Sequence, residues 1–362
     1  MFRVATFVSY RLGGADGVSE EARKWAWALE QLGFTTRRVA GEIEDAGHAD
    51  DVVVPGLALA AEEEPDAAIL AAALAGSDLV VVENICSLPI NERAARATAH
   101  ALEQAPYRVV FHHHDLPWQR RAFSHLSNEF PPRTDGALHV TVNQRSRREL
   151  EARGFAHTAV LQNRFDLDAP LGDRDATRAQ FGFGPDELVV FQPSRAIERK
   201  NVPGGVRVSA DLARVFPNWP VRYWLSGPAE DGYGPVLERI VERSTVPVTL
   251  GRAANSADAY AASDLVVLPS TWEGFGNPTI ESVAARRPLA AFAYPVLSEI
   301  LATGLRFFST NDVATLARFL REPAEVHERF HEVNRHRARL SYSLADRPAA
   351  LDDALAAHGW LW

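Results

Sequence analysis

Short runs of apolar, often β-branched residues alternate along the chain with longer segments in which apolar residues recur every three or four positions. The short runs predict buried strands, and the longer segments predict the amphipathic helices that join them. In the first half the expected strands are 3–9, 35–39, 79–83, 108–113 and 138–142, and the expected helices are 19–32, 66–75, 92–104 and 146–153. In the second half the expected strands are 188–191, 221–226, 246–250, 265–268 and 289–292. This alternation predicts an α/β fold with two doubly wound parallel sheets.

A polar segment rich in Asp, Gly and Pro separates the two series of strands. Such a composition is typical of a linker, here with room for one short helix. We therefore expect an N-terminal domain at 1–168, a linker at 169–186 and a C-terminal domain at 187–345. Sheets of this kind bind ligands outside the carboxyl ends of their strands, so we expect the functional side chains to lie there.

Composition narrows the classes of function. Lys and Arg number 38 against 47 Asp and Glu, for a net charge of -9, which disfavours binding to nucleic acid. The single cysteine, Cys86, cannot form an intramolecular disulfide, and this favours a reducing cytoplasm. No apolar run reaches the roughly 18 to 20 residues of a membrane span. The basic segment 327–339 leaves peripheral contact with acidic lipid open.

The most informative segment follows the predicted strand 265–268. A loop with Gly274 and Gly276 leads to Asn277 as the expected N-cap of a helix with Pro278 at its first position. Glycines allow the backbone to approach a ligand closely, and free amides at a helix start can hold phosphate oxygens. The segment therefore predicts an anion-binding loop.

Two carboxylates flank this loop. Glu273 lies within it, and Glu281 lies about one turn into the helix. Carboxylates would repel a phosphate, so they fit the site if they accept hydrogen bonds from neutral hydroxyls of the same ligand. A ligand with both phosphate and many hydroxyls is a nucleotide sugar. The alternative is an ordinary helix cap beside two surface glutamates.

A basic loop follows the predicted strand 188–191. It carries Arg195, Arg199 and Lys200 to the carboxyl end of that strand. Cations placed there would stabilise the negative charge that grows on a departing phosphate. The alternative is a solvated turn that pairs with Glu198. Of the three cations, we expect Arg199 to lie at the surface.

A run of histidines, His112 to His114, ends the predicted strand 108–113 and precedes Asp115. On an extended strand His112 and His114 share one face. His-x-His beside a carboxylate is a known zinc-ligand arrangement, but no further ligand set stands at a suggestive spacing. We expect His112 and His113 to be buried core residues.

The basic loop and the loop with Glu273 and Glu281 (the glutamate loop), in this order along the chain, resemble the retaining glycosyltransferases of family 4, glycosyl transferases group 1. Glu273 and Glu281 have that family's E-x7-E spacing, and Arg195 with Lys200 matches its basic phosphate pair. The resemblance covers most of the chain and implies the GT-B fold, with two Rossmann-like domains facing a central cleft. The expected N-terminal domain would then be the acceptor side and the C-terminal domain the donor side. A last helix within 346–362 would return to the N-terminal domain.

The resemblance also implies roles for individual residues. Glu281 would hold the ribose and Glu273 the donor sugar, with His114 facing that sugar from the N-terminal domain. The remaining donor-binding positions would act mainly through their backbone: Gly13, Gly14, Gly227, Gly274, Phe275, Gly276 and Asn277.

We therefore expect a cytoplasmic enzyme that moves a hexosyl unit from a nucleoside-diphosphate sugar to a hydroxyl of a sugar, glycan, lipid or small metabolite. The anomeric configuration would be retained, and neither a metal nor a cofactor would be needed. Two alternatives stay open: a metal-dependent hydrolase built on His112, His114 and Asp115, and a nucleotide-sugar binding protein whose catalysis has lapsed.

Overall fold

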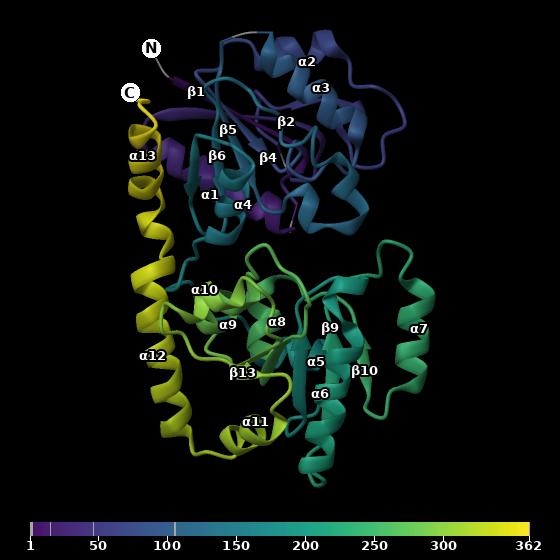
Figure 1. Cartoon of the computed structure of the whole chain (residues 1–362). Coiled ribbons are helices and arrows are strands. Elements are labelled where there is room, and N and C mark those ends of the chain that lie inside the picture. Colours follow the sequence, from purple (N-terminus) through teal and green to yellow (C-terminus); the bar gives the residue numbers. More distant parts are fainter. Residues whose placement is uncertain (1–2, 15, 46, 105, 362) are drawn as a thin grey trace. The chain divides into compact units, whose positions relative to one another are not determined.

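The computed structural model describes residues 3–14, 16–45, 47–104 and 106–361. The chain forms two compact units: unit 1 comprises Met1–Arg164 with Leu344–Trp362, and unit 2 comprises Phe165–Ser343. Each unit is a parallel sheet with helices packed against it (Figure 1). The predicted α/β class is confirmed.

Unit 1 contains a seven-stranded sheet in the order β3-β2-β1-β4-β5-β6-β7. Its strands are β1 (Arg3–Leu12), β2 (Phe34–Ile43), β3 (Val52–Val53), β4 (Leu79–Glu83), β5 (Arg108–His113), β6 (Leu138–Thr141) and β7 (Thr158–Val160). Its helices are α1 (Gly17–Gln31), α2 (Ala67–Leu74), α3 (Glu92–Glu103), α4 (Gln144–Ala152) and α13 (Arg347–Ala357). The five strands that the sequence predicts here are confirmed, whereas β3 and β7 are additional.

Alternate residues of β4 pack into two apolar cores, one on each face of the sheet. Val80 and Val82 lie in one apolar cluster, and Leu79 and Val81 lie in the other. This explains why β4 is apolar at four successive positions, since a strand buried on both faces has no polar side. The second cluster also holds Leu351 and Leu355 of α13, and the same helix places buried Arg347 against Glu21 of α1, with Nη2 to Oε2 at 2.7 Å.

Unit 2 contains a six-stranded sheet in the order β10-β9-β8-β11-β12-β13. Its strands are β8 (Leu188–Gln192), β9 (Val221–Leu225), β10 (Val248–Leu250), β11 (Leu265–Leu268), β12 (Leu289–Ala291) and β13 (Phe308–Ser309). Its helices are α5 (Arg174–Phe181), α6 (Val202–Val215), α7 (Gly234–Arg243), α8 (Ser256–Ala262), α9 (Pro278–Ala284), α10 (Leu297–Leu301), α11 (Val313–Leu320) and α12 (Ala324–Tyr342). All five strands predicted here are present, and β13 is additional.

The segment expected as a linker, 169–186, belongs to unit 2, and the division of the chain falls between Arg164 and Phe165. The reason is that α5, which this segment contains, is bonded to the end of α8 and to Asp264, the residue before β11. Arg174 donates to Asp264 at 2.6 Å, and buried Arg178 donates to the carbonyl oxygen of Ala262 at 2.9 Å. Arg174 and Arg178 thus tie this polar segment to unit 2, although most of its residues are exposed.

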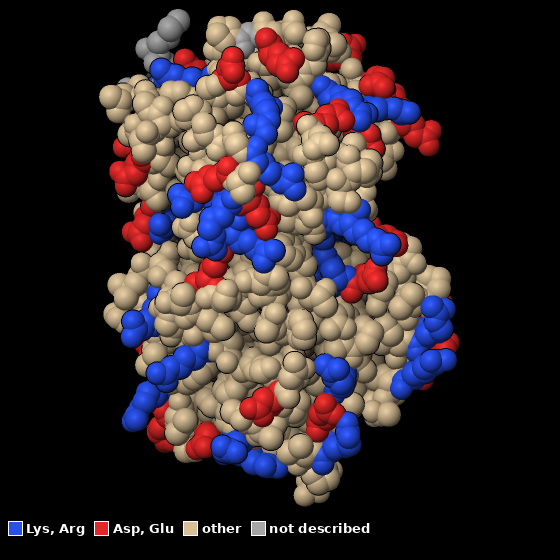
Figure 2. All heavy atoms as spheres, in the orientation of Figure 1, with Lys and Arg blue, Asp and Glu red and all other residues tan. Residues whose placement is uncertain are grey.

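No helix in the described part of the chain combines the length and apolar character needed to cross a bilayer. On the face drawn in Figure 2, basic and acidic side chains are interspersed over both units, so neither sign forms a continuous field on that face.

Candidate functional site

The two loops singled out in the second half of the chain follow neighbouring strands of unit 2. β8 pairs with β11, and the strand order reverses between them, because β9 extends the sheet on one side and β12 on the other. The carboxyl ends of strands at such a reversal leave a crevice, which is where open α/β sheets bind ligands. The basic loop and the glutamate loop both start at this position.

The basic loop is held by a tight turn before α6. Glu198–Lys200 form one 3-10 turn, and Asn201 follows with φ 49°, in the left-handed region that Asn tolerates better than most residues. Asn201 accepts from the amide of Gly204 at 3.2 Å and donates to the carbonyl oxygen of Pro269 at 3.1 Å. The turn thus caps α6 and ties the basic loop to the end of β11.

Glu273 lies between two cations of the basic loop. Lys200 Nζ donates to its Oε1 at 2.6 Å, and Arg199 Nη1 donates to its Oε2 at 3.1 Å. Arg199 also donates to the carbonyl oxygen of Trp272 at 3.1 Å. The side chains of Glu273 and Lys200 are only 8% and 12% exposed, so this is a nearly buried ion pair rather than a surface contact.

Burial and charge shift the pKa of both partners. Burial lowers the pKa of Lys200 to about 8, although Glu273 opposes that effect. Burial raises the pKa of Glu273, but Lys200 and Arg199 outweigh it and hold the pKa below its ordinary value. Glu273 is therefore charged at neutral pH, and the pKa of Lys200 is close to neutral pH.

The expectation that Arg199 lies at the surface is wrong, because its side chain is 19% exposed and bonded to Glu273. Arg195 is the more exposed cation, at 38%, and Nη1 pairs with Glu230 Oε2 at 2.5 Å. The sequence did not indicate Glu230, since it lies in the loop after β9, outside both motifs.

Glu281 lies in the first turn of α9, half-buried, and Tyr260 of α8 donates its hydroxyl to Glu281 Oε2 at 2.6 Å. Burial together with the neighbouring carboxylate raises the pKa of Tyr260 well above its ordinary value, so this hydroxyl keeps its proton. Tyr260 orients the carboxylate and is a site residue that the sequence did not indicate.

The loop between Glu273 and α9 is closely packed. Gly276 has φ 96°, and a Cβ there would lie 2.2 Å from the Tyr294 hydroxyl, so both conformation and space require glycine. Tyr294 donates that hydroxyl to the carbonyl oxygen of Phe275 at 2.9 Å, and Phe275 is buried. Asn277 occupies the N-cap position, as expected. Gly274 lies half-buried in the same loop.

Gly227 positions the basic loop. Its amide donates to the carbonyl oxygen of Ser194 at 3.0 Å, and a Cβ at Gly227 would lie 2.6 Å from the Cα of Arg195. Two loops approach here more closely than any side chain would allow. The structure thus accounts for this glycine by packing.

The first glycine loop, in unit 1, follows β1. Gly13 has φ 79°, and a Cβ at Gly14 would lie 2.8 Å from a carboxylate oxygen of Glu44. The helix that follows is already capped, because Asp16 Oδ1 accepts from the amides of Val18 at 3.0 Å and Ser19 at 3.3 Å.

The histidine run ends β5 in unit 1. His112 and His113 are buried, as expected, and His114 has a side chain 12% exposed. His113 contacts Ser87 Oγ at 2.6 Å and His139 Nδ1 at 3.0 Å. Of the three rings, His114 is the one that reaches the surface of unit 1.

Glu83, at the end of β4, lies beside His112 and His114, whereas the Asp115 expected there pairs with Arg120 at 2.8 Å. Glu83 and His112 are Cα partners in the parallel register of β4 and β5. Among the described residues, Glu83, His112 and His114 are the group of three side chains that could hold a metal ion. Their distances of 2.9 to 3.1 Å are also those of ordinary hydrogen bonds.

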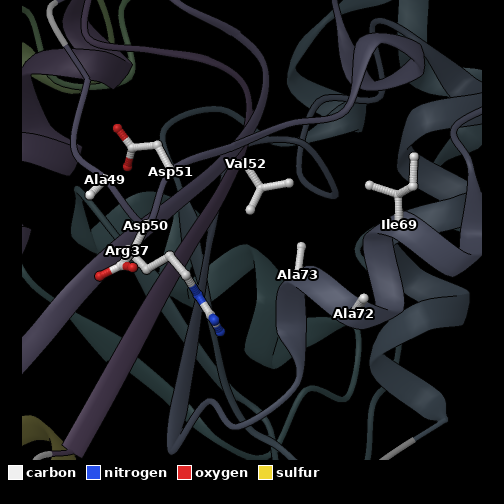
Figure 3. Close-up of a pocket in the computed structure, with 8 residues that line it drawn as sticks. All are labelled: Arg37, Ala49, Asp50, Asp51, Val52, Ile69, Ala72 and Ala73. Atoms are coloured by element: carbon white, nitrogen blue, oxygen red, sulfur yellow. The ribbon is translucent and has the colours of Figure 1, made fainter.

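A shallow hollow lies at the β2–β3 edge of unit 1, lined in part by Arg37, Asp51, Val52 and Ile69 (Figure 3). Two of its charged side chains, Arg37 and Asp51, are already bonded within the fold. Arg37 donates to Thr6, Ser77 and the carbonyl oxygen of Ala75, and Asp51 accepts from Arg38. The contacts within the fold therefore account for Arg37 and Asp51 in this hollow without a ligand.

Known proteins resemble the chain in sequence. Residues 191–323 match the family described as Glycosyl transferases group 1. Mannosylglucosylglycerate synthase from Thermotoga maritima is 26% identical over 363 aligned positions, which cover 84% of each chain. D-inositol 3-phosphate glycosyltransferase from Rhodococcus opacus is 31% identical over 212 positions, which cover 51% of this chain and 47% of that protein.

Solved structures resemble the fold. HepE from Anabaena, determined in complex with UDP-glucose, has a TM-score of 0.73 and 20% identity, and the match covers 98% of this chain and 99% of that one. Sucrose-phosphate synthase from Thermosynechococcus elongatus has a TM-score of 0.73 and 16% identity, with 98% of both chains covered. These matches establish the GT-B fold. The chain is a glycosyltransferase of that fold, and its residues 191–323 match the glycosyl transferases group 1.

Proposed function

We propose that the protein is a retaining, metal-independent hexosyltransferase that uses a nucleoside-diphosphate sugar. The observation that carries this proposal is the buried contact of Glu273 with Lys200 and Arg199 at the strand-order reversal of unit 2. A carboxylate for sugar hydroxyls and cations for phosphate oxygens are held there as one preorganised group. Preorganised charge of this kind is usually the largest contribution to catalysis.

The donor would use the two loops as follows. Arg195 and Lys200 bind the diphosphate, Glu273 accepts from hydroxyls of the hexosyl unit, and Glu281 accepts from the ribose. HepE, one of the proteins of the same fold, was determined with UDP-glucose, which has this combination of groups. His114 of unit 1 is proposed to contact the hexosyl unit.

In the proposed reaction the bond between the anomeric carbon and the phosphate oxygen breaks, and its electron pair stays on the diphosphate. Arg195 and Lys200 stabilise that charge. The acceptor hydroxyl forms its bond to the anomeric carbon on the face that the diphosphate leaves, and a phosphate oxygen takes the hydroxyl proton. The product therefore keeps the donor's configuration, and no protein nucleophile takes part.

The names of the relatives suggest a class of acceptor. Glycerate and inositol 3-phosphate, which those names contain, are small polyhydroxylated acids. We propose that the acceptor is likewise a small hydroxyl-rich metabolite.

Substitution of Lys200 tests the proposal. The chain contains two lysines, Lys24 and Lys200, and each pairs with a buried glutamate at 2.6 Å. Lys200→Met is expected to lower kcat by about 10²- to 10³-fold, because it removes one cation from the departing phosphate. Lys24→Met, in unit 1, is the matched control and should keep wild-type turnover. Transfer is measured as release of the nucleoside diphosphate with and without acceptor.

Two further measurements separate the alternatives. NMR of the product should show the donor's anomeric configuration, and an inverted product would contradict the retaining mechanism. Activity should be unchanged after dialysis against EDTA, whereas loss of activity restored by Zn²⁺ would favour the metal-dependent hydrolase. Binding of donor sugars without any turnover would favour the lapsed binding protein.

A further inference from the structure

We propose that Glu83 is a positioning residue of the transfer reaction: its carboxylate holds Nε2 of His114 and so presents Nδ1 of the same ring to the substrate. This inference rests on the proposed function and assigns a role to a buried acid outside both loops of unit 2. Glu83 is the last residue of β4, and β4 neighbours β1 at the strand-order reversal of the unit 1 sheet. The group therefore stands at the edge where a ligand of this sheet would bind.

The carboxylate of Glu83 contacts two histidines and is fully buried. His112 Nδ1 lies 2.9 Å from Oε2 and 3.0 Å from Oε1, and His114 Nε2 lies 3.1 Å from Oε2. Within the described part of the chain, its ion-pair partners are these two histidines. A buried carboxylate is stabilised by nearby positive charge, which here comes from Arg347 and from protonation of a histidine ring.

Of the two rings, His114 is the one whose surroundings favour the extra proton. His112 is completely buried against Trp25, with ring centroids 4.3 Å apart, and its Nε2 has no hydrogen-bond partner in the part of the chain that the structure describes. Burial lowers the pKa of His112 and also acts on His114, but Glu83 outweighs that effect and raises the pKa of His114. The pKa of Glu83 itself falls to about 2 despite burial, because of His112 and His114.

The other charged groups facing this cluster are already paired. Glu21 and Asp115 add to the raised pKa of His114. Glu21 of α1 is bonded to Arg347 of α13 and to Lys24, and Asp115 is bonded to Arg120. Glu83 is thus the group that contacts His114 directly and governs its charge.

This arrangement leaves one nitrogen of His114 for a substrate. Nε2 is used by Glu83, the backbone amide of His114 donates to Asn84 Oδ1 at 3.3 Å, and Nδ1 has no hydrogen-bond partner among the described residues. A protonated ring held at one nitrogen donates from the other in a defined direction. Glu83 therefore acts on the reaction through His114 rather than by contact with substrate.

Glu83→Gln tests the inference because it keeps the size of the side chain and removes its charge. In the unliganded protein, NMR titration should show the pKa of His114 falling, with its signal identified by its loss in His114→Gln. Values of kcat/KM should fall about 10- to 100-fold at neutral pH, as for other partners that orient a histidine. Activity should recover as the pH is lowered, because His114 then regains its proton.

Glu187→Gln is the matched control. Glu187 is also a buried glutamate, in unit 2, and its Oε1 accepts from Arg222 at 2.9 Å; it precedes β8, at the opposite end of that strand from the basic loop. This variant should lose stability without a change in the pH profile. An unchanged His114 pKa and pH profile in Glu83→Gln would overturn the inference.

A double-mutant cycle keeps the inference testable if Glu83→Gln folds poorly. In a His114→Gln background, Glu83→Gln should cause no further loss of kcat/KM, since coupled residues are not additive. A further loss of the same size as in wild type would overturn the inference. So would stoichiometric Zn²⁺ binding that disappears in Glu83→Gln and is needed for activity. If the wild type turns over no donor sugar, the proposed function fails, but the NMR titration still tests the Glu83–His114 contact.

Discussion

The charge balance around Glu273 decides what the candidate donor site can hold. Arg199 and Lys200 contact the glutamate, while Arg195 contacts Glu230 at the more exposed end of the loop. These three cations contact two carboxylates, whereas the third carboxylate of the candidate site, Glu281, contacts the Tyr260 hydroxyl. Binding of a diphosphate is expected to displace Glu230, whose exposed pair with Arg195 is weak.

Activity should decline as the pH rises through about 8, because Lys200 then loses its proton and with it the charge that stabilises the departing phosphate. The measurement is the pH profile of kcat/KM between pH 6 and 10. Lys200→Arg should remove this decline, since arginine stays charged throughout that range. A decline at the same pH in Lys200→Arg would assign it to another group.

Individual contacts were the least predictable features. The E-x7-E spacing identifies Glu273 and Glu281, but neither Tyr260 nor Glu230 has a local signal, because each comes from a different helix or loop. Glu83 was missed for the same reason. It joins His112 through the register of two parallel strands, which a linear pattern does not specify.

At the level of elements, the loops that follow β8 and β9 depend on each other. Ala196 donates its amide to the carbonyl oxygen of Pro228 at 2.8 Å, and Gly227 donates to Ser194 at 3.0 Å. Arg195 lies between these contacts, so its position is set by the neighbouring strand as much as by its own loop.

Gly227→Ala is expected to destabilise unit 2 by about 1–3 kcal/mol, because a new methyl group would overlap the backbone of Arg195. Donor binding should weaken as well, since the basic loop must move. Gly234→Ala is the matched control, because a Cβ at Gly234 meets no atom within 4 Å. Thermal unfolding and calorimetric titration with a nucleoside diphosphate measure both effects. Equal behaviour of the two variants would contradict this account of Gly227.

Strands buried on both faces were predictable from the sequence, and very short strands were not. β4, β5 and β11 match their predicted ranges because their apolar runs end abruptly at polar residues or proline. β3, β7 and β13 have two or three residues each, too few for any periodicity to appear. Likewise, α5 was recognised as a short helix, but its bonds to Asp264 were not predictable from composition.

For the whole molecule, the structure places Glu273, Glu281, Arg195 and Lys200 in unit 2, while His114 and Glu83 belong to unit 1. The contiguous unit 2 therefore carries the proposed donor groups, and unit 1 is assembled from both ends of the chain. A bound nucleotide should accordingly stabilise unit 2 more than unit 1.

A panel of UDP-, GDP- and ADP-sugars should contain one donor that stabilises the protein by about 2.7 kcal/mol at 100 times its dissociation constant. Hydrogen exchange measured by mass spectrometry on the full chain should then show protection at 193–201 and 270–281. The matched control is the same sugar without its nucleotide. Protection confined to unit 1 would contradict the assignment of the donor groups.

The nearly buried amine of Lys200 has a practical consequence. An amine that releases its proton close to physiological pH is a good nucleophile toward acylating reagents, and the chain offers only Lys24 as a competing lysine. Brief treatment with an activated ester would then leave a covalent tag on the donor loop, and a bound nucleotide would shield it. The fraction of protein with bound nucleotide could then be measured from the acylation of the single peptide that contains Lys200, and the acceptor need not be known.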